Sequence, residues 1–127
     1  MRVLLDTCTF LWWCLDAPEL SAAARHLILS AEVAYFSPAS AWEISVKYKL
    51  GKLELPVPPG DWVPKMRKAH GFETLPISED ASLTLNRLPD LHKDPFDRLL
   101  TAQALHEGLV LVTPDPLIRA YPVRVEW

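Results

Sequence analysis

The segment His92-Lys93-Asp94-Pro95-Phe96-Asp97-Arg98-Leu99-Leu100 opens a predicted helix in this chain of 127 residues. Asp94 suits the N-cap and Pro95 the first helical position, where a missing N–H costs nothing. Asp97 then occupies the third helical position, from which a carboxylate can complete a capping box. Two acids near the positive end of a helix therefore have a purely structural explanation. The helix is predicted over residues 95–107, and Gly108 separates it from the aliphatic strand 109–112.

Short aliphatic strands alternate with helices on either side of this segment. The predicted strands are 2–5, 33–36, 72–77, 109–112 and 123–125. The predicted helices are 10–14, one opened by Pro18 and Ser21, 38–50, 62–70, 78–85, 95–107 and 115–120, with a proline-rich loop over 52–64. This alternation is typical of a parallel sheet covered by helices on both faces. We expect an α/β fold with a mostly parallel central sheet, forming a single domain over residues 1–127.

Composition limits the functions that the chain can perform unaided. The net charge is −3 and the sequence pI is about 5.8, so there is no simple basic footprint for nucleic acid. Binding to a polyanion would need positive charge from metal ions. Cys8 and Cys14 lack the spacing of a zinc site and are expected to be buried thiols in a reducing compartment. With no signal peptide and no apolar stretch of membrane-spanning length, a soluble cytoplasmic protein is expected.

Four separate acids lie where a sheet of this kind would bind a ligand. Asp6 directly follows strand 2–5, and Asp115 lies three residues after strand 109–112. Glu43 is about two turns into the helix that leaves strand 33–36, and Asp97 heads the helix before strand 109–112. Parallel strands joined by right-handed crossovers end on the same edge, which is where ligands bind. We therefore expect all four acids to converge there.

Each acid also has a simpler interpretation. Glu43 could form a surface ion pair with Lys47 four residues later, and Asp115 could cap its own short helix. Asp6 has no evident capping duty. Four gathered carboxylates would repel one another, which raises their pKa values or requires a metal. Mg²⁺ and Mn²⁺ prefer oxygen ligands, and a pair of such ions can promote hydrolysis of a phosphodiester.

Four motifs together resemble PIN-domain ribonucleases, and among them the toxins of VapBC-type toxin–antitoxin modules. They are Leu4-Leu5-Asp6-Thr7, Ser37-Pro38-Ala39-Ser40-Ala41-Trp42-Glu43-Ile44, the segment from His92 to Ala104, and Leu111-Val112-Thr113-Pro114-Asp115. The resemblance implies a PIN-like three-layer fold and assigns the metal-binding, catalytic quartet to Asp6, Glu43, Asp97 and Asp115. It favours Asp97 over Asp94, because a Leu-Leu-x-Ala-x-Ala-like helix follows the family's third acid.

The same resemblance implies the activity and the partners. It implies Mg²⁺- or Mn²⁺-dependent cleavage of RNA, inhibition by a small cognate antitoxin, and frequent homodimerisation. Related chains often carry histidine where this chain has Cys8, so an auxiliary role for that position is not carried over.

Several further residues are candidates with structural alternatives. Thr7, Thr113 and Asp94 could support the metal-binding carboxylates from outside the ligand shell. Arg98, Lys47 and His92 could contact RNA, although cations on helix surfaces are usually only solvated. His92 could alternatively orient a carboxylate, or simply be solvated or capping.

Two rival functions remain open from the sequence. A phosphatase of the haloacid-dehalogenase type also begins with a strand and an aspartate nucleophile, but it needs a second acid two residues later, where this chain has Cys8. A non-catalytic partner-binding module could keep the PIN fold. The four acids argue against it, because binding a partner does not require them.

Overall fold

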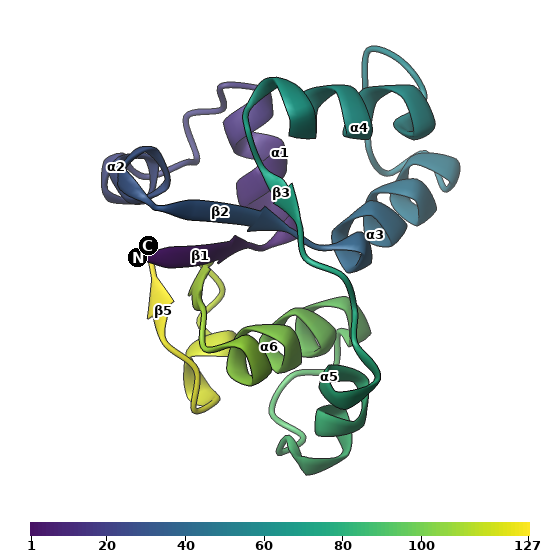
Figure 1. The fold of residues 1–127 in the computed structure, drawn as a ribbon. Helices are drawn as coiled ribbons and strands as arrows, with labels where there is room; N and C mark the ends of the chain where they lie inside the picture. Colours follow the sequence, from purple (N-terminus) through teal and green to yellow (C-terminus); the bar gives the residue numbers. More distant parts are fainter.

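Five parallel strands form the central sheet of the computed structural model, which describes residues 1–127 (Figure 1). They follow the order β3-β2-β1-β4-β5 across the sheet. The strands are β1 (Arg2–Leu5), β2 (Val33–Phe36), β3 (Glu73–Thr74), β4 (Val110–Val112) and β5 (Val125–Glu126). Every pairing is parallel, and β1 lies at the centre between β2 and β4. The predicted α/β fold is confirmed.

Helices connect the strands, and most begin at a residue that the sequence marks as an N-cap. They are α1 (Thr7–Cys14), α2 (Ala22–Ser30), α3 (Pro38–Lys49), α4 (Pro59–Ala69), α5 (Glu79–Thr84) and α6 (Pro95–Glu107), with 3₁₀ turns η1 (Leu85–Arg87) and η2 (Ile118–Ala120). Ser21, Ser37 and Ser78 each accept a backbone N–H at the start of α2, α3 and α5. Gly108 ends α6 with a positive φ of 66°, the left-handed conformation that glycine adopts at low cost.

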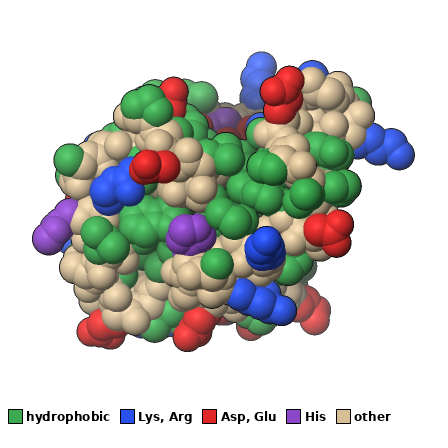
Figure 2. Space-filling view, turned by 90° about the horizontal axis from the view of Figure 1, so that it is seen from above, with side chains coloured by type: hydrophobic (Ala, Val, Ile, Leu, Met, Phe, Trp, Pro, Cys, Tyr) green, Lys and Arg blue, Asp and Glu red, His purple; other side chains and the backbone are tan.

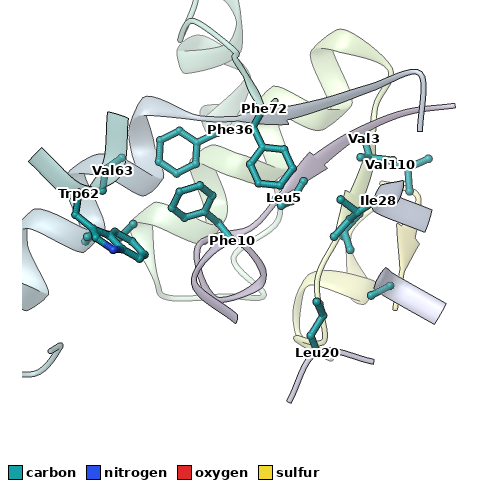
Figure 3. Close-up of a cluster of buried hydrophobic side chains, with 13 residues drawn as sticks. Val3, Leu5, Phe10, Leu20, Ile28, Phe36, Trp62, Val63, Phe72 and Val110 are labelled. Carbon is teal, nitrogen blue, oxygen red and sulfur yellow. The ribbon is translucent and has the colours of Figure 1, made fainter. Parts of the chain in front are cut away.

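Hydrophobic side chains fill the space on both faces of the sheet. Because successive residues of a strand point to opposite faces, Val3 and Leu5 pack with helices α1, α2 and α4, whereas Leu4 packs with α6. Phe10 belongs to the cluster that contains Val3 and Leu5, which we call the first core cluster. Its ring centroid lies 4.3 Å from that of Phe36 (Figure 3). Apolar packing on both faces of the sheet gives the domain three layers: helices, sheet and helices. It leaves the carboxyl ends of β1 and β4 free to carry polar groups.

Five predicted boundaries were wrong. Helix α1 begins at Thr7 rather than at Phe10. Helix α4 begins at Pro59 rather than near residue 62, because Pro59 occupies its first turn and Pro64 is tolerated within it. Strand β3 is only two residues long, since it is an edge strand followed by Pro76. The predicted helix 115–120 is a turn closed by Asp115 and the 3₁₀ turn η2. The last strand lies at 125–126 rather than 123–125.

The surface has no membrane-spanning element but does present apolar area. None of the helices has the length and hydrophobicity needed to cross a membrane. On the face in Figure 2, hydrophobic side chains gather in the centre, and charged side chains lie mostly around them. Several partly buried hydrophobic residues pack over the first core cluster, among them Leu11, Trp12, Leu53, Leu55 and Met66. Trp42 is 59% exposed and packs edge-on against Phe96, so it does not belong to the core.

Candidate metal centre

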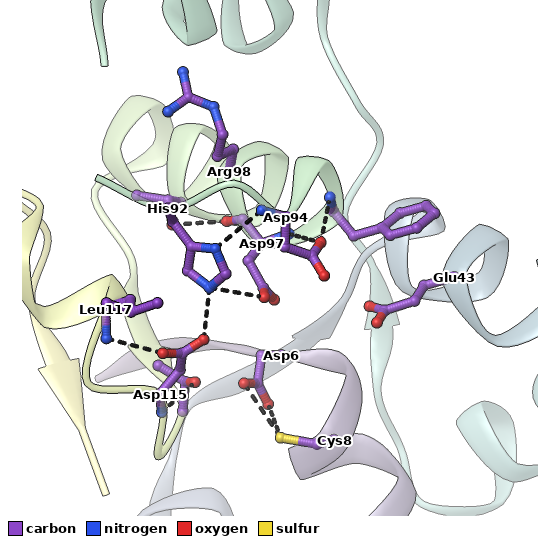
Figure 4. A network of polar contacts seen from close by, with 12 residues as sticks. Asp6, Cys8, Glu43, His92, Asp94, Asp97, Arg98, Asp115 and Leu117 are labelled. Carbon is purple, nitrogen blue, oxygen red and sulfur yellow. Dashed lines mark hydrogen bonds and ion pairs between the residues drawn. The ribbon is translucent and has the colours of Figure 1, made fainter. Parts of the chain in front are cut away.

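The four predicted acids line one cleft at the carboxyl end of the sheet. Asp6 follows β1, Asp115 follows β4, Glu43 lies on α3 and Asp97 on α6. The cleft has a volume of about 330 Å³ and is also lined by Asp94, Lys47 and Lys52. Figure 4 shows the acids facing the same space from different elements. The expected convergence of the four acids is therefore present in the structure.

Asp6 serves both the helix that follows it and the cleft. Its Oδ1 accepts the backbone N–H of Thr9 at 2.8 Å, so Asp6 is the N-cap of α1. The expectation that Asp6 has no capping duty was therefore wrong, because α1 begins at Thr7 rather than Phe10. Burial raises the pKa of the Asp6 carboxyl, and hydrogen bonds from Thr113 and Thr9 oppose that shift.

Glu43 is buried, unlike the surface acid of the simpler interpretation. It is 4% exposed, and its Oε2 accepts a hydrogen bond from Nζ of Lys47. Burial lowers the pKa of Lys47, but the hydrogen bond and charge of Glu43 outweigh that effect and raise it overall. The other oxygen of Glu43, Oε1, is buried without a hydrogen-bond partner. A buried, unpaired carboxylate oxygen facing the cleft is the atom that most needs a further ligand.

Asp94 and Asp97 have separate roles at the start of α6. Oδ1 of Asp94 accepts the backbone N–H groups of Phe96 at 2.8 Å and Asp97 at 3.2 Å, which confirms its predicted capping role. Asp97 makes no capping contact. Burial and the charges of Asp94, Glu43 and Asp6 raise the pKa of Asp97 to about 7, although His92 lowers it. Burial and the neighbouring carboxylates therefore both favour the protonated form of Asp97.

We expect Asp94→Ala to lower the free energy of unfolding by about 1 kcal/mol, because the first turn of α6 loses its cap. Asp94→Asn keeps an oxygen in the same place and should lose much less. Urea unfolding of both variants at one pH measures the difference. Equal losses in the two variants would contradict the capping role.

His92 lies among the acids, which sequence reasoning only partly anticipated. Its Nε2 is 2.7 Å from Oδ2 of Asp115 and 3.2 Å from Oδ2 of Asp97. The side chain is only 10% exposed, so the solvated alternative was wrong. Asp115 also accepts the N–H of Leu117 on Oδ1, and its own N–H donates to Thr113 Oγ1. The available signal was a histidine two residues before the helix cap.

Arg98 does not face the cleft, so the structure does not support its predicted contact with RNA. Its guanidinium donates to the carbonyl oxygens of Pro89 and Leu85 and to the hydroxyl of Tyr121. Figure 4 shows this side chain pointing away from the acids. Its donors are already committed to the segment that precedes α6.

Buried polar contacts hold together the helices that carry the acids. The hydroxyl of Thr7 donates to Oγ of Ser40 at 2.9 Å, which joins α1 to α3. The hydroxyl of Ser37 donates to Oε1 of Gln103, and the amide of Gln103 donates to the carbonyl oxygen of Leu75 at 3.2 Å. These contacts fix α3 against α6. Sequence reasoning missed Gln103, which looks like an ordinary helix residue until its burial is known.

Both cysteines are free and partly buried. Sγ of Cys8 lies 3.3 Å from Oδ1 of Asp6, and burial followed by the charge of Asp6 raises the pKa of the thiol. Burial raises the pKa of Cys14 to about 12. Neither thiol is activated as a nucleophile or thiolate ligand.

The donor set fits a hard divalent cation. Carboxylate oxygens are the ligands that Mg²⁺ and Mn²⁺ prefer, and an ion in the cleft would oppose both the burial and the neighbouring charges that raise the pKa of Asp97. Carboxylate oxygens of Asp97 and Asp115 lie within 4.8 Å of one another, and Glu43, whose Oε1 is unpaired, lines the same cleft. The residues present are therefore suited to holding the ion.

Comparisons with known proteins agree on one family. Residues 3–123 match the family described as PIN domain. The chain is 30% identical over 120 residues to Ribonuclease VapC22 from Mycobacterium tuberculosis (strain ATCC 25618 / H37Rv), covering 94% of this chain and 91% of that protein. A crystal structure of VapBC2 from Rickettsia felis, bound to a promoter DNA fragment, superimposes with a TM-score of 0.73. That match has 17% sequence identity and covers 100% of this chain and 99% of the other.

A second solved structure has the same fold. VapBC-5 from Mycobacterium tuberculosis, described as a member of the VapBC family of toxin-antitoxin systems, matches with a TM-score of 0.60 and 18% identity. The match covers 98% of this chain and 96% of the other. At these identities, the two structures support the fold alone.

Proposed function

This chain belongs to the PIN domain family, and we propose that it is a metal-dependent endoribonuclease toxin of the VapC type, formed by one domain over residues 1–127. The ribonuclease assignment follows from the family and from the relative that spans nearly the whole chain. The proposed part is how the chain does this chemistry: with Asp6, Glu43, Asp97 and Asp115 as ligands for Mg²⁺ or Mn²⁺.

The observation that carries this proposal is the unpaired Oε1 of Glu43. A carboxylate that is 4% exposed normally has all its oxygens paired, and this one lines a cleft with four further acids. Apolar or paired groups at these positions would make the fold more stable, because buried like charges destabilise it. Stability alone therefore does not explain the cluster. A bound cation explains why these acids are kept together.

Each side chain has a distinct part in the proposed reaction. When bound, the divalent ions would supply an activated water and stabilise the leaving oxygen of the phosphodiester. The four carboxylates hold the ions, and Asp97 must be deprotonated to do so. Lys47 and Lys52 lie on the cleft wall, where either can contact a phosphate. No covalent intermediate on the protein is needed.

The family also indicates the partners. We propose that a cognate antitoxin covers part of this surface, because VapBC-5, which has the same fold, belongs to a toxin-antitoxin system. The hydrophobic side chains at the centre of the face in Figure 2, with charged groups mostly around them, form the kind of surface that binds a protein partner. A homodimer and action on RNA in the cytoplasm complete the proposal, and size-exclusion chromatography with light scattering tests the dimer.

The decisive experiment measures RNA cleavage with and without divalent metal. Wild type should cut RNA with Mg²⁺ or Mn²⁺ and lose activity in EDTA. Glu43→Gln and Asp6→Asn should each lower the rate by more than about 100-fold, because a metal ligand matters more than the outer-shell partners that cost 10–100-fold. Glu79→Gln changes an acid in the first turn of α5, outside the cleft, and is the matched control.

Other outcomes would favour a rival function. Equal rates in wild type and both cleft variants would overturn the assigned ligands. A protein that binds an antitoxin but takes up no Mn²⁺ and cuts no RNA would be a non-catalytic PIN module. Trapping of a phosphorylated Asp6 would instead support the phosphatase alternative.

A further inference from the structure

His92 lies against Asp97 and Asp115, two of the acids that line the cleft. Its Nε2 contacts Oδ2 of Asp115 at 2.7 Å and Oδ2 of Asp97 at 3.2 Å (Figure 4). On the other side of the ring, Nδ1 accepts the backbone N–H of Asp94 at 3.0 Å. Both ring nitrogens therefore have partners.

These partners determine where the ring proton lies. The N–H of Asp94 can only donate, so Nδ1 must present its lone pair to it. A neutral imidazole with a lone pair on Nδ1 carries its proton on Nε2. That Nε2–H then donates to Asp115 and, at the longer distance, to Asp97. Neither nitrogen has a lone pair free for a cation, although the cluster of His92, Asp97 and Asp115 resembles a metal-ligand set.

A second set of contacts fixes the backbone around His92. The N–H of His92 donates to the hydroxyl of Tyr121 at 2.9 Å, and Arg98 donates to the same hydroxyl at 3.0 Å. Arg98 also donates to the carbonyl oxygens of Pro89 and Leu85, at 2.9 and 3.1 Å. Arg98 thus anchors the segment that carries His92.

Asp115 is oriented from both sides. Nε2–H of His92 binds its Oδ2, and the backbone N–H of Leu117 binds its Oδ1 at 2.9 Å. Each carboxylate oxygen keeps a further lone pair for another ligand. Without the imidazole, rotation of the Asp115 side chain would be restrained on one oxygen only.

We propose that His92 is a positioning residue that holds Asp115 and Asp97 in the arrangement that receives the cation, and that it is not itself a metal ligand. This inference rests on the proposed metal-dependent function. It extends that function by assigning a structural role to His92, Asp94 and Arg98 in the His-x-Asp-Pro-x-Asp-Arg segment. His92 orients two acids, Asp94 begins α6 and fixes the imidazole tautomer, and Arg98 anchors the segment before the helix.

Two substitutions separate positioning from other roles. His92→Gln keeps an N–H donor near the place of Nε2, whereas His92→Leu keeps bulk without a donor. Mn²⁺ dissociation constants, measured by titration of the free-ion EPR signal, should rise about 10–100-fold in His92→Leu and only a few-fold in His92→Gln. The exposed His26→Gln is the control and should match wild type. Affinity in His92→Leu equal to that of wild type would overturn the proposal.

Measurements on the wild-type protein test the same inference without any variant. Imidazole ¹⁵N shifts of the metal-free protein should identify His92 as the tautomer protonated on Nε2. Pulsed EPR of the Mn²⁺-loaded protein should lack the strong ¹⁴N coupling of a directly bound imidazole. Such a coupling, or a proton on Nδ1, would refute the positioning role. If wild type binds no Mn²⁺ at all, the proposed function fails, while the tautomer measurement still decides how His92 is bonded.

Discussion

Asp97→Asn is expected to change stability and activity in opposite directions. In the absence of divalent metal at pH 8, the variant should be more stable than wild type by about 1 to 2 kcal/mol, since one pKa unit corresponds to roughly 1.4 kcal/mol and the partial exposure of Asp97 screens part of the shift. With Mg²⁺ or Mn²⁺ present, its RNA cleavage should fall by more than about 100-fold, as for the other ligands. Thermal unfolding and a cleavage assay on the same preparations measure both effects.

The pH dependence of the metal-free protein follows from the same residue. The pKa of Asp97 is 3.8 ordinarily and about 7 in the folded chain. Between these values the folded protein binds a proton that the unfolded chain does not, so the free energy of unfolding falls as pH rises. The contribution is fully present below pH 3.8 and is lost as pH rises through about 7. The raised pKa of Asp6 acts in the same direction.

Asp97→Asn should therefore flatten the stability profile between pH 5 and 8, and saturating Mn²⁺ should flatten that of wild type. The exposed Glu79 offers a control, because Glu79→Gln should leave the slope unchanged. A wild-type protein whose metal-free stability rises with pH across this range would show that the raised pKa of Asp97 does not dominate the profile.

The sequence predicted the fold well where local and global signals agree. Strands 33–36 and 109–112 and the helix that begins at Pro95 follow from aliphatic runs, a capping aspartate and a helix-ending glycine, which all favour the same structure. Predictions were poorer near Pro59 and Pro76. Pro59 is compatible with either a helix start or a loop. Only the packing of Trp62 and Val63 into the first core cluster favours the helix.

For the candidate site, topology was sufficient to gather the acids but not to describe their surroundings. Asp6, Glu43, Asp97 and Asp115 could be brought together because parallel strands end on one edge. The roles of Arg98 and Gln103 could not be predicted, since each depends on contacts with segments distant in sequence. The burial of Glu43 could not be predicted either, because an acid followed by a lysine four residues later is typical of an ion pair on the surface of a helix.

Phe10→Ala is expected to lower the free energy of unfolding by about 3 to 5 kcal/mol, a large part of the roughly 5 to 15 kcal/mol that stabilises a domain. Phe10 has no exposed surface, and its ring contacts those of Phe36, Trp62 and Phe72, whose centroids lie 4.3, 6.1 and 6.0 Å away. Truncation would leave a cavity among aromatic rings that cannot close around it. Urea unfolding measures the loss, and Leu83→Ala is the control because Leu83 is 61% exposed.

The effect of Phe10→Ala should reach the cleft through helix α1. Asp6 caps this helix and Phe10 anchors it in the core, so loosening the anchor also frees one of the proposed ligands. A cation that binds only the folded chain adds about 2.7 kcal/mol at 100 times its dissociation constant. Mn²⁺ should therefore restore part of the stability lost in Phe10→Ala, and restore none when Asp97→Asn is added. Equal restoration in both backgrounds would place the stabilising ion outside this cleft.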